Sequence, residues 1–308
     1  MCPKNLLAVF LLTLYQALAG AQSTCELQTR QAALPHGNVV YSQTQAATFD
    51  AVPIVLLHGL FASKEQWHGL MCELSNRGFL LIAPDLPGYG KSKGFPDADY
   101  RLAEQVLRLR EFLQALPETA NRSVALAGNS MGGTIASRYA RRYPAEVASL
   151  ALFAPMGITG ANDWSDEFKA LLRAEKNPMI PLTVADFEHE LALLLAHPPV
   201  LPLTDKALAV AQYQTALPHY RKVWNIVTHG DPQTCQRPNL PSHLPTRMPT
   251  LVLWGEQERL LTVSTPERAA ACLPGSRYQR LPESGHLPQL DNPVGLAEAY
   301  RAFLEQPK

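Results

Sequence analysis

The stretch Gly128-Asn129-Ser130-Met131-Gly132-Gly133 joins a short apolar run at 123–127 to a helical pattern at 131–142. A Gly-x-Ser-x-Gly sequence in this position is typical of a sharp strand-to-helix turn that exposes the serine hydroxyl. The glycines permit close backbone approach, and the unpaired N–H groups at the helix start favour a developing negative charge. The stretch therefore predicts Ser130 as a nucleophile.

Similar runs recur along the chain and alternate with helical patterns. They are continuous apolar runs of four to six residues, at 53–57, 79–83, 123–127, 150–153 and 250–254. Continuous runs are typical of strands that are buried on both faces of a parallel sheet. Helical patterns at 63–78, 100–116, 131–142 and after Pro293 lie between or beyond them. We therefore predict an α/β fold with a doubly wound, mostly parallel sheet.

The segment 157–247 interrupts this alternation. It contains helical runs separated by proline-rich joints and no clear strand, the runs being 165–176, 183–197, 204–215 and 219–228. An insertion at this place would cover the sheet edge at which open α/β sheets bind ligands. We therefore predict a helical lid over 157–247, between a first core part at 22–156 and a second at 248–308.

The N-terminal residues 1–21 have the features of a secretory signal peptide. Lys4 precedes an apolar run at 6–14, and small residues follow in Ala17-Leu18-Ala19-Gly20-Ala21. We expect cleavage and export to the periplasm or medium. An uncleaved N-terminal membrane anchor is the alternative, although Gln16 interrupts the run and a bilayer span needs about 20 residues.

Four cysteines remain once Cys2 is removed with the signal peptide: Cys25, Cys72, Cys235 and Cys272. An even number in an oxidising compartment predicts two disulfides, for which three pairings are open. We favour Cys25–Cys72 and Cys235–Cys272, since each joins cysteines of one half of the chain. The cysteines show no Cys-x-x-Cys spacing, so we expect no metal site.

Composition excludes two other classes of protein. The chain has 27 basic and 27 acidic residues, which removes the charge expected of a nucleic-acid-binding protein. At 46% hydrophobic residues it is not a disordered chain.

Three further motifs complete a candidate catalytic site. His286, in Ser284-Gly285-His286, comes late in the chain and is the expected general base for Ser130. For the acid that orients it we choose Glu258, which follows the run ending at Trp254, while Glu256 and Asp163 remain alternatives.

A second loop supplies the expected oxyanion hole. In this architecture the loop after the first apolar run donates one backbone N–H, and the residue after the nucleophile donates the other. We assign these donors to Leu60, with Phe61 as the alternative, and to Met131. We expect the neighbouring His58 to stabilise the turn rather than to act in catalysis.

With these motifs in place the chain resembles the α/β-hydrolase superfamily. The landmarks are His58-Gly59, 85–92 (DLPGYGKS), the Ser130 turn, Trp254-Gly255 and Gly285-His286. The motifs at 58–64 (HGLFASK), 128–133 and 177–181 (NPMIP) are similar to those of secreted bacterial lipases and monoacylglycerol lipases. This family usually has Asp at the position of Glu258, so this chain departs from it by one methylene.

The resemblance implies a serine hydrolase that cleaves a carboxylic ester, with a small-molecule acyl ester or lipid as substrate and without a metal or organic cofactor. The lid is then a candidate for contact with a lipid surface. The main alternative is an aminopeptidase, in which lid carboxylates such as Asp186, Glu188 or Glu190 would hold an amino terminus. Other amide or C–C bond hydrolases of the same fold, and a non-catalytic binding protein, are further alternatives; the intact Ser130 and His286 argue against the last.

Overall fold

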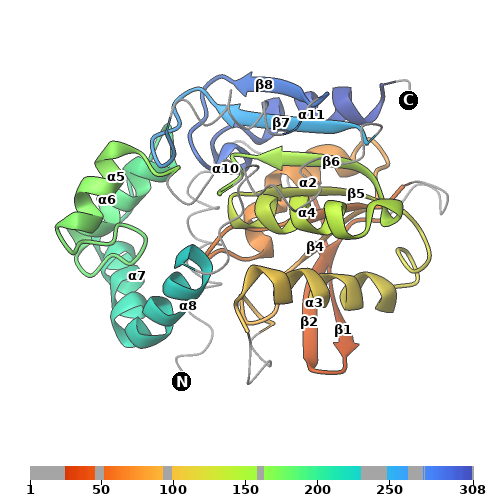
Figure 1. The fold of residues 1–308 in the computed structure, drawn as a ribbon. Helices are drawn as coiled ribbons and strands as arrows, with labels where there is room; N and C mark the ends of the chain where they lie inside the picture. Colours follow the sequence, from red (N-terminus) through yellow and green to blue (C-terminus); the bar gives the residue numbers. More distant parts are fainter. Residues whose placement is uncertain are drawn as a thin grey trace.

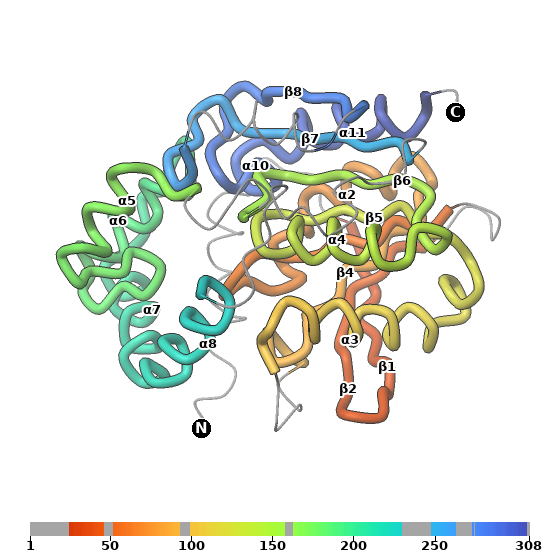
Figure 2. Tube along the Cα trace, in the orientation of Figure 1, coloured from red at the N-terminus to blue at the C-terminus, as the bar shows by residue number. Residues whose placement is uncertain are grey.

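The apolar runs form neighbouring strands of one sheet in the computed structural model, which describes residues 25–45, 52–92, 99–157, 163–229, 248–262, 273 and 275–306 (Figure 1). The strands are β1 (Gln28–Leu34), β2 (Gly37–Gln43), β3 (Ile54–Leu57), β4 (Leu81–Pro84), β5 (Val124–Asn129), β6 (Val147–Phe153), β7 (Thr250–Gly255) and β8 (Arg277–Leu281). Their order in the sheet is β1-β2-β4-β3-β5-β6-β7-β8. Figure 2 shows the β1–β2 hairpin in red at one edge and β8 in blue at the other.

The sheet is parallel from β4 to β8 and antiparallel at the β1–β2 edge. Every residue of β3, β4, β5 and β7 is buried, as continuous apolar runs predict. The predicted doubly wound, mostly parallel sheet is therefore confirmed. The β1–β2 hairpin was not predicted from the sequence.

Helices cover both faces of the sheet. Helices α3 (Leu102–Ala115) and α4 (Met131–Arg142) pack on one face, and α2 (His68–Ser75) and α11 (Pro293–Leu304) pack on the other (Figure 1). The side chains of β3 alternate between the two faces. Val55 and Leu57 belong to the hydrophobic cluster on the α3 and α4 side, whereas Ile54 and Leu56 belong to the cluster on the α2 and α11 side. This alternation follows from the two-residue period of a strand.

Four helices of the predicted lid segment lie beside the carboxyl ends of β6, β7 and β8. They are α5 (Asp166–Arg173), α6 (Val184–Leu194), α7 (Leu203–Thr215) and α8 (Leu217–His229), at the left in Figure 1. Backbone hydrogen bonds tie this group to the core, from Ser165 N–H to the Leu260 carbonyl and from Leu287 N–H to the Leu194 carbonyl. These four helices therefore lie next to the edge of the sheet at which open α/β folds bind their ligands.

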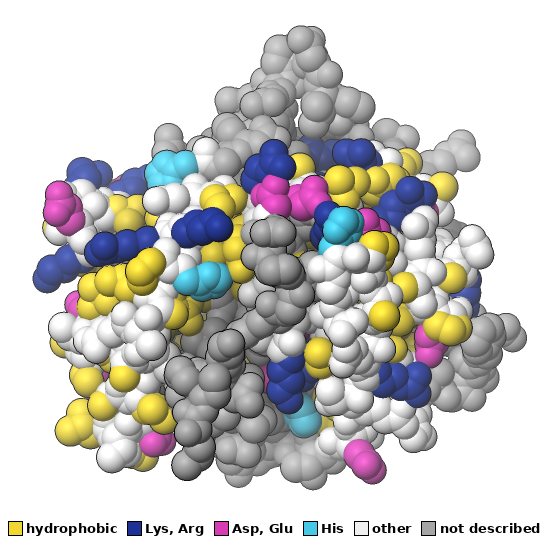
Figure 3. Space-filling view, turned by 90° about the horizontal axis from the view of Figure 1, so that it is seen from below, with side chains coloured by type: hydrophobic (Ala, Val, Ile, Leu, Met, Phe, Trp, Pro, Cys, Tyr) yellow, Lys and Arg dark blue, Asp and Glu magenta, His cyan; other side chains and the backbone are white. Residues whose placement is uncertain are grey.

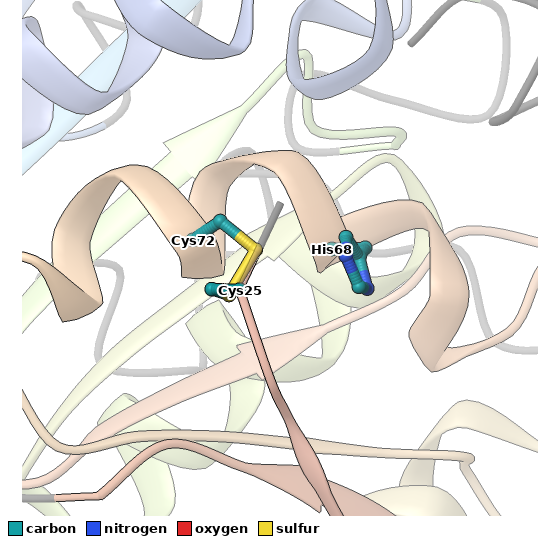
Figure 4. A group of neighbouring side chains, drawn as sticks. All are labelled: Cys25, His68 and Cys72. Atoms are coloured by element: carbon teal, nitrogen blue, oxygen red, sulfur yellow. A yellow bond between two sulfur atoms is a disulfide. The ribbon is translucent and has the colours of Figure 1, made fainter. Parts of the chain in front are cut away.

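A disulfide joins Cys25, just before β1, to Cys72 of α2 (Figure 4). This confirms the first predicted pair. Cys235 and Cys272 lie outside the described residues, as do residues 1–24 with the predicted signal peptide. His68 lies one helical turn before Cys72. A ring nitrogen of His68 and the sulfur atoms of Cys25 and Cys72, all of them atom types that bind metals, lie within 4.8 Å of one another. Because both sulfurs are bonded to each other, they do not offer the thiolates that a metal would need.

Removing the Cys25–Cys72 disulfide should lower the free energy of unfolding by about 3–4 kcal/mol, because it links residues 47 positions apart. Cys25→Ala is the suitable variant, since Cys25 is half-buried whereas Cys72 is fully buried. Urea unfolding of the wild type and the variant under non-reducing conditions provides the measurement. Non-reducing peptide mass analysis should find Cys25 linked to Cys72. If all four thiols of the exported protein can be alkylated, this prediction is wrong.

Candidate active site

Ser130 occupies the turn between β5 and α4 in a conformation that non-glycine residues rarely adopt. Its backbone angles are φ 52° and ψ −119°, and its N–H donates to the Phe153 carbonyl at 3.0 Å. Such a conformation costs energy and persists only where the surroundings impose it. Here two buried elements fix the turn, so Ser130 is held at the carboxyl end of the sheet.

The flanking glycines allow α4 to begin directly against the strands. A Cβ on Gly132 would lie 2.1 Å from the Leu57 carbonyl oxygen, and a Cβ on Gly128 would lie 2.4 Å from backbone atoms of Gly132. Real Cβ atoms do not approach backbone so closely. The Gly-x-Ser-x-Gly spacing is therefore a packing requirement of this turn as well as a chemical signature.

His286 lies on the loop between β8 and α10 (Pro288–Asp291), with 2% of its surface exposed. Its Nδ1 is 2.8 Å from Glu258 Oε2. Its Nε2 is buried and has no hydrogen-bond partner among the described residues. Because a hydrogen on Nδ1 would point to the carboxylate, Nε2 is left with the lone pair that a general base needs.

Glu258 is the candidate acid that contacts His286. While Oε2 faces the imidazole, Oε1 accepts the N–H groups of Leu260 at 2.8 Å and Leu261 at 3.1 Å. These bonds fix the carboxylate on its loop. Glu256 is exposed, and Asp163 is buried within the predicted lid segment, where its backbone carbonyl accepts the N–H of Thr262.

The side chain of Asn129 links the Ser130 turn to the His286 loop by hydrogen bonds. This link was not predicted from the sequence. Its amide nitrogen donates to the carbonyls of Phe153 and His286, both at 3.0 Å, and its oxygen accepts from the Gln289 amide at 3.2 Å. All these groups are buried. Asn129 therefore holds the backbone of His286 against the strand that precedes Ser130, although His286 and Ser130 are far apart in sequence.

The residues expected to form an oxyanion hole lie beside Ser130. A Cβ on Gly59 would be 3.5 Å from Ser130 Cβ, so the backbone at Gly59 lies close to the serine. Leu60 lines the same pocket as Ser130. Met131 is the first residue of α4, and the first N–H groups of a helix have no acceptor within it.

His58 has a structural role, as predicted. Its Nδ1 donates to the Gly59 carbonyl at 2.8 Å, and its Nε2 accepts the Leu86 N–H at 3.0 Å. Complete burial lowers the pKa of His58 to about 4, so the ring is neutral at physiological pH. Both ring nitrogens therefore form hydrogen bonds, which connect the loop at Gly59 to the loop at Leu86.

Ser130 and His286 line one pocket, which is partly open to solvent. Most of its wall is apolar and comes from both the core and the lid helices, with Leu60, Phe61, Ala62, Met179, Phe187, Leu191, Leu194, Leu195, Leu287 and Leu290. Such a wall suits a hydrocarbon chain bound next to the serine.

Two polar residues of the predicted lid segment, Glu190 and Tyr213, also line this pocket. Their proximity was not predicted from the sequence. Glu190 of α6 is 4% exposed, and its Oε1 accepts the Tyr213 hydroxyl at 3.3 Å. Burial raises the pKa of Glu190 to about 8. The other two carboxylates considered for an amino terminus, Asp186 and Glu188, do not line the pocket: Glu188 pairs with Lys206, and Asp186 accepts the Thr183 hydroxyl.

Comparison with known proteins agrees with this geometry. The alpha/beta hydrolase fold family matches residues 52–293. Lipase 3 of Moraxella sp. (strain TA144) is 29% identical over 283 residues, covering 92% of this chain and 86% of that protein. Monoacylglycerol lipase ABHD6 of Bos taurus is 27% identical over 260 residues, covering 82% and 74%.

A solved structure is similar over almost the whole chain. The crystal structure of a membrane phospholipase A, described as a bacterial virulence factor, is 28% identical with a TM-score of 0.79, covering 98% of this chain and 91% of that one. These similarities confirm the predicted relationship to bacterial lipases and monoacylglycerol lipases. They also support the prediction that the chain is a carboxylic ester hydrolase.

Proposed function

Because the chain belongs to the α/β-hydrolase family, we propose that it hydrolyses acyl esters through a triad of Ser130, His286 and Glu258. One observation carries the proposal. The buried Nε2 of His286 has no partner among the described residues, and its Nδ1 contacts a carboxylate, while the residue lines the same pocket as Ser130. A ring held in this way is ready to accept one proton from a hydroxyl.

The first half of the reaction forms an acyl-enzyme. Ser130 Oγ attacks the ester carbonyl carbon while its proton passes to His286 Nε2. The carbonyl oxygen becomes an oxyanion, which accepts the N–H groups of Leu60 and Met131; each such donor lowers the barrier by about 3 kcal/mol. The C–O bond to the alcohol then breaks, and the alcohol leaves with the proton from His286.

The second half releases the acid. Water gives a proton to His286 Nε2 and attacks the acyl carbon, and the oxyanion forms again in the same place. The bond to Ser130 Oγ breaks, the serine regains its proton, and the carboxylic acid departs. Glu258 stabilises the positive imidazolium in both halves of the reaction.

We infer that the acyl chain is of medium or long length, as in a monoacylglycerol or a similar ester. The apolar wall between core and lid supports this, since it would bury the hydrocarbon next to the reacting carbonyl. The test is a series of p-nitrophenyl esters from acetate to palmitate, together with monoacylglycerols. We expect kcat/KM to rise from acetate to a medium or long chain. Turnover of aminoacyl anilides in place of esters would overturn the proposal.

An aminopeptidase would need a carboxylate in the pocket to bind the amino terminus of its substrate, and Glu190 lines the pocket. A substrate ammonium needs an ionised carboxylate, whereas Glu190, with a pKa of about 8, is mostly protonated at neutral pH. The residues lining the described pocket include no second carboxylate near this wall to share the charge. The site therefore favours a neutral ester.

The segment 157–247 is proposed to act as a lid that meets a lipid surface. Three large apolar side chains are exposed on its α7 side: Val200 at 97%, Leu203 at 70% and Leu208 at 45%. Figure 3 shows hydrophobic side chains gathered on this side of the molecule, at the left. Contact with lipid would bury these groups and bring ester substrate to the pocket.

We also propose that the protein is exported after cleavage of residues 1–21. The Cys25–Cys72 disulfide supports this, since disulfides persist in oxidising compartments. In the part of the chain that the structure describes, no helix has the length and apolar character to cross a bilayer.

A further inference from the structure

Glu190 is an ionisable group placed in a hydrocarbon environment. Along α6 it follows Phe187 by three residues and precedes Leu194 by four, so helix geometry puts the three on one face. All three line the pocket that contains Ser130. A carboxyl in such a place loses hydration, which a protein tolerates only where the group has partners.

The partners within the protein are few. Tyr213 of α7 donates its hydroxyl to Glu190 Oε1 at 3.3 Å, a long hydrogen bond. No lysine or arginine is among the described residues that line the pocket, so no cation there compensates a negative charge. Burial accordingly raises the pKa of Glu190 to about 8. At neutral pH the group is mainly a carboxylic acid, which can both donate and accept a hydrogen bond.

A purely hydrocarbon substrate would offer no hydrogen-bond partner to Glu190 and Tyr213. Unmatched buried polar groups are costly, and a site built around them rejects ligands that cannot bond to them. A hydroxyl fits the pair because it can accept from the Glu190 acid and donate to an oxygen of Glu190 or Tyr213. An ammonium has no acceptor function and would require ionised Glu190.

We propose that Glu190 and Tyr213 form a subsite for a hydroxyl group on the ester substrate, which makes hydroxyl-bearing acyl esters the preferred substrates. This inference rests on the proposed ester hydrolysis. The hydroxyl could belong to the alcohol, as in a glycerol monoester, or to the acyl chain, as in a hydroxy fatty acid. Both have the same chemistry at this subsite.

Three matched esters distinguish the two sources: ethyl decanoate, 1-decanoylglycerol and ethyl 3-hydroxydecanoate. We expect the wild type to have a kcat/KM for one of the two hydroxyl-bearing esters that is about 10- to 100-fold above that for ethyl decanoate. Glu190→Leu should reduce this ratio to about one. Glu190→Gln, which retains a donor and an acceptor, should restore most of it.

The matched control is Glu188→Leu, because Glu188 lies on the same helix but is exposed and pairs with Lys206. It should keep the wild-type ratio. Tyr213→Phe is the second variant if Glu190→Leu does not fold, and it should lower the ratio in the same direction.

An unchanged ratio in Glu190→Leu and in Tyr213→Phe overturns the subsite while leaving ester hydrolysis intact. A wild type that hydrolyses none of the three esters overturns the proposed function itself. A preference for the ethyl ester of an ω-amino acid over its neutral analogue, lost in Glu190→Gln, would assign the pair to a cation instead.

Discussion

Ser130→Ala should lower kcat for p-nitrophenyl esters by at least about a thousandfold and leave the fold intact. The substitution removes only the Oγ atom that would form the acyl-enzyme. It adds little backbone strain, because alanine and serine meet the same penalty at a positive φ. Urea unfolding should therefore give a free energy within about 1 kcal/mol of the wild type.

His286→Ala should have an effect of similar size, and the double variant should be little worse than either single one. Residues that act as a unit in one step show this non-additive behaviour. The control is His197→Ala, which removes an exposed histidine that contacts Glu283 at the surface. It should retain wild-type activity. Near-normal esterase activity in either Ser130→Ala or His286→Ala would eliminate this mechanism.

The buried strands were predictable because their environment imposes one pattern. A strand covered by helices on both sides needs a continuous apolar run, and β3, β5 and β7 each contain one. Strand β1 lies at the sheet edge and is largely exposed, with the sequence QTRQAAL. Its polar residues are equally suited to a loop. The antiparallel hairpin was therefore missed for a physical reason.

The candidate site was predictable where local geometry demands particular residues. The Ser130 turn needs small neighbours on both sides, and this requirement is visible in sequence. The acid was left open among three residues, because a carboxylate in a loop has no local requirement to distinguish it. Only the tertiary structure shows that Glu258 reaches Nδ1 of His286.

Glu190 illustrates a signal that was available but ambiguous. Asp186, Glu188 and Glu190 are acidic residues at every second position, and this pattern suggests that Glu190 lies on a solvated helix face. Read at helical spacing with Phe187 and Leu191, it belongs to the buried stripe of the helix. The second pattern would have placed it in the pocket, although not next to Tyr213, which comes from another helix.

Glu258→Ala should lower kcat by about 10³- to 10⁴-fold, whereas Glu256→Ala should change it less than about threefold. Without the Glu258 carboxylate, the His286 ring loses the contact that fixes its tautomer and the charge that stabilises its protonated form. Glu256 is a matched control because it is an exposed glutamate two residues away on the same loop. Steady-state kinetics with one p-nitrophenyl ester is sufficient to measure both.

The isosteric Glu258→Gln separates charge from position. The amide can still occupy the place of the carboxylate and accept from Leu260 and Leu261, but it carries no charge to stabilise an imidazolium. We therefore expect a loss of kcat close to that of Glu258→Ala, with KM within about threefold of the wild type. Asp163→Asn provides the opposing test. If Asp163→Asn abolishes activity while Glu258→Gln reduces it only mildly, the acid is Asp163, and the Glu258 contact with Nδ1 serves only to position the loop.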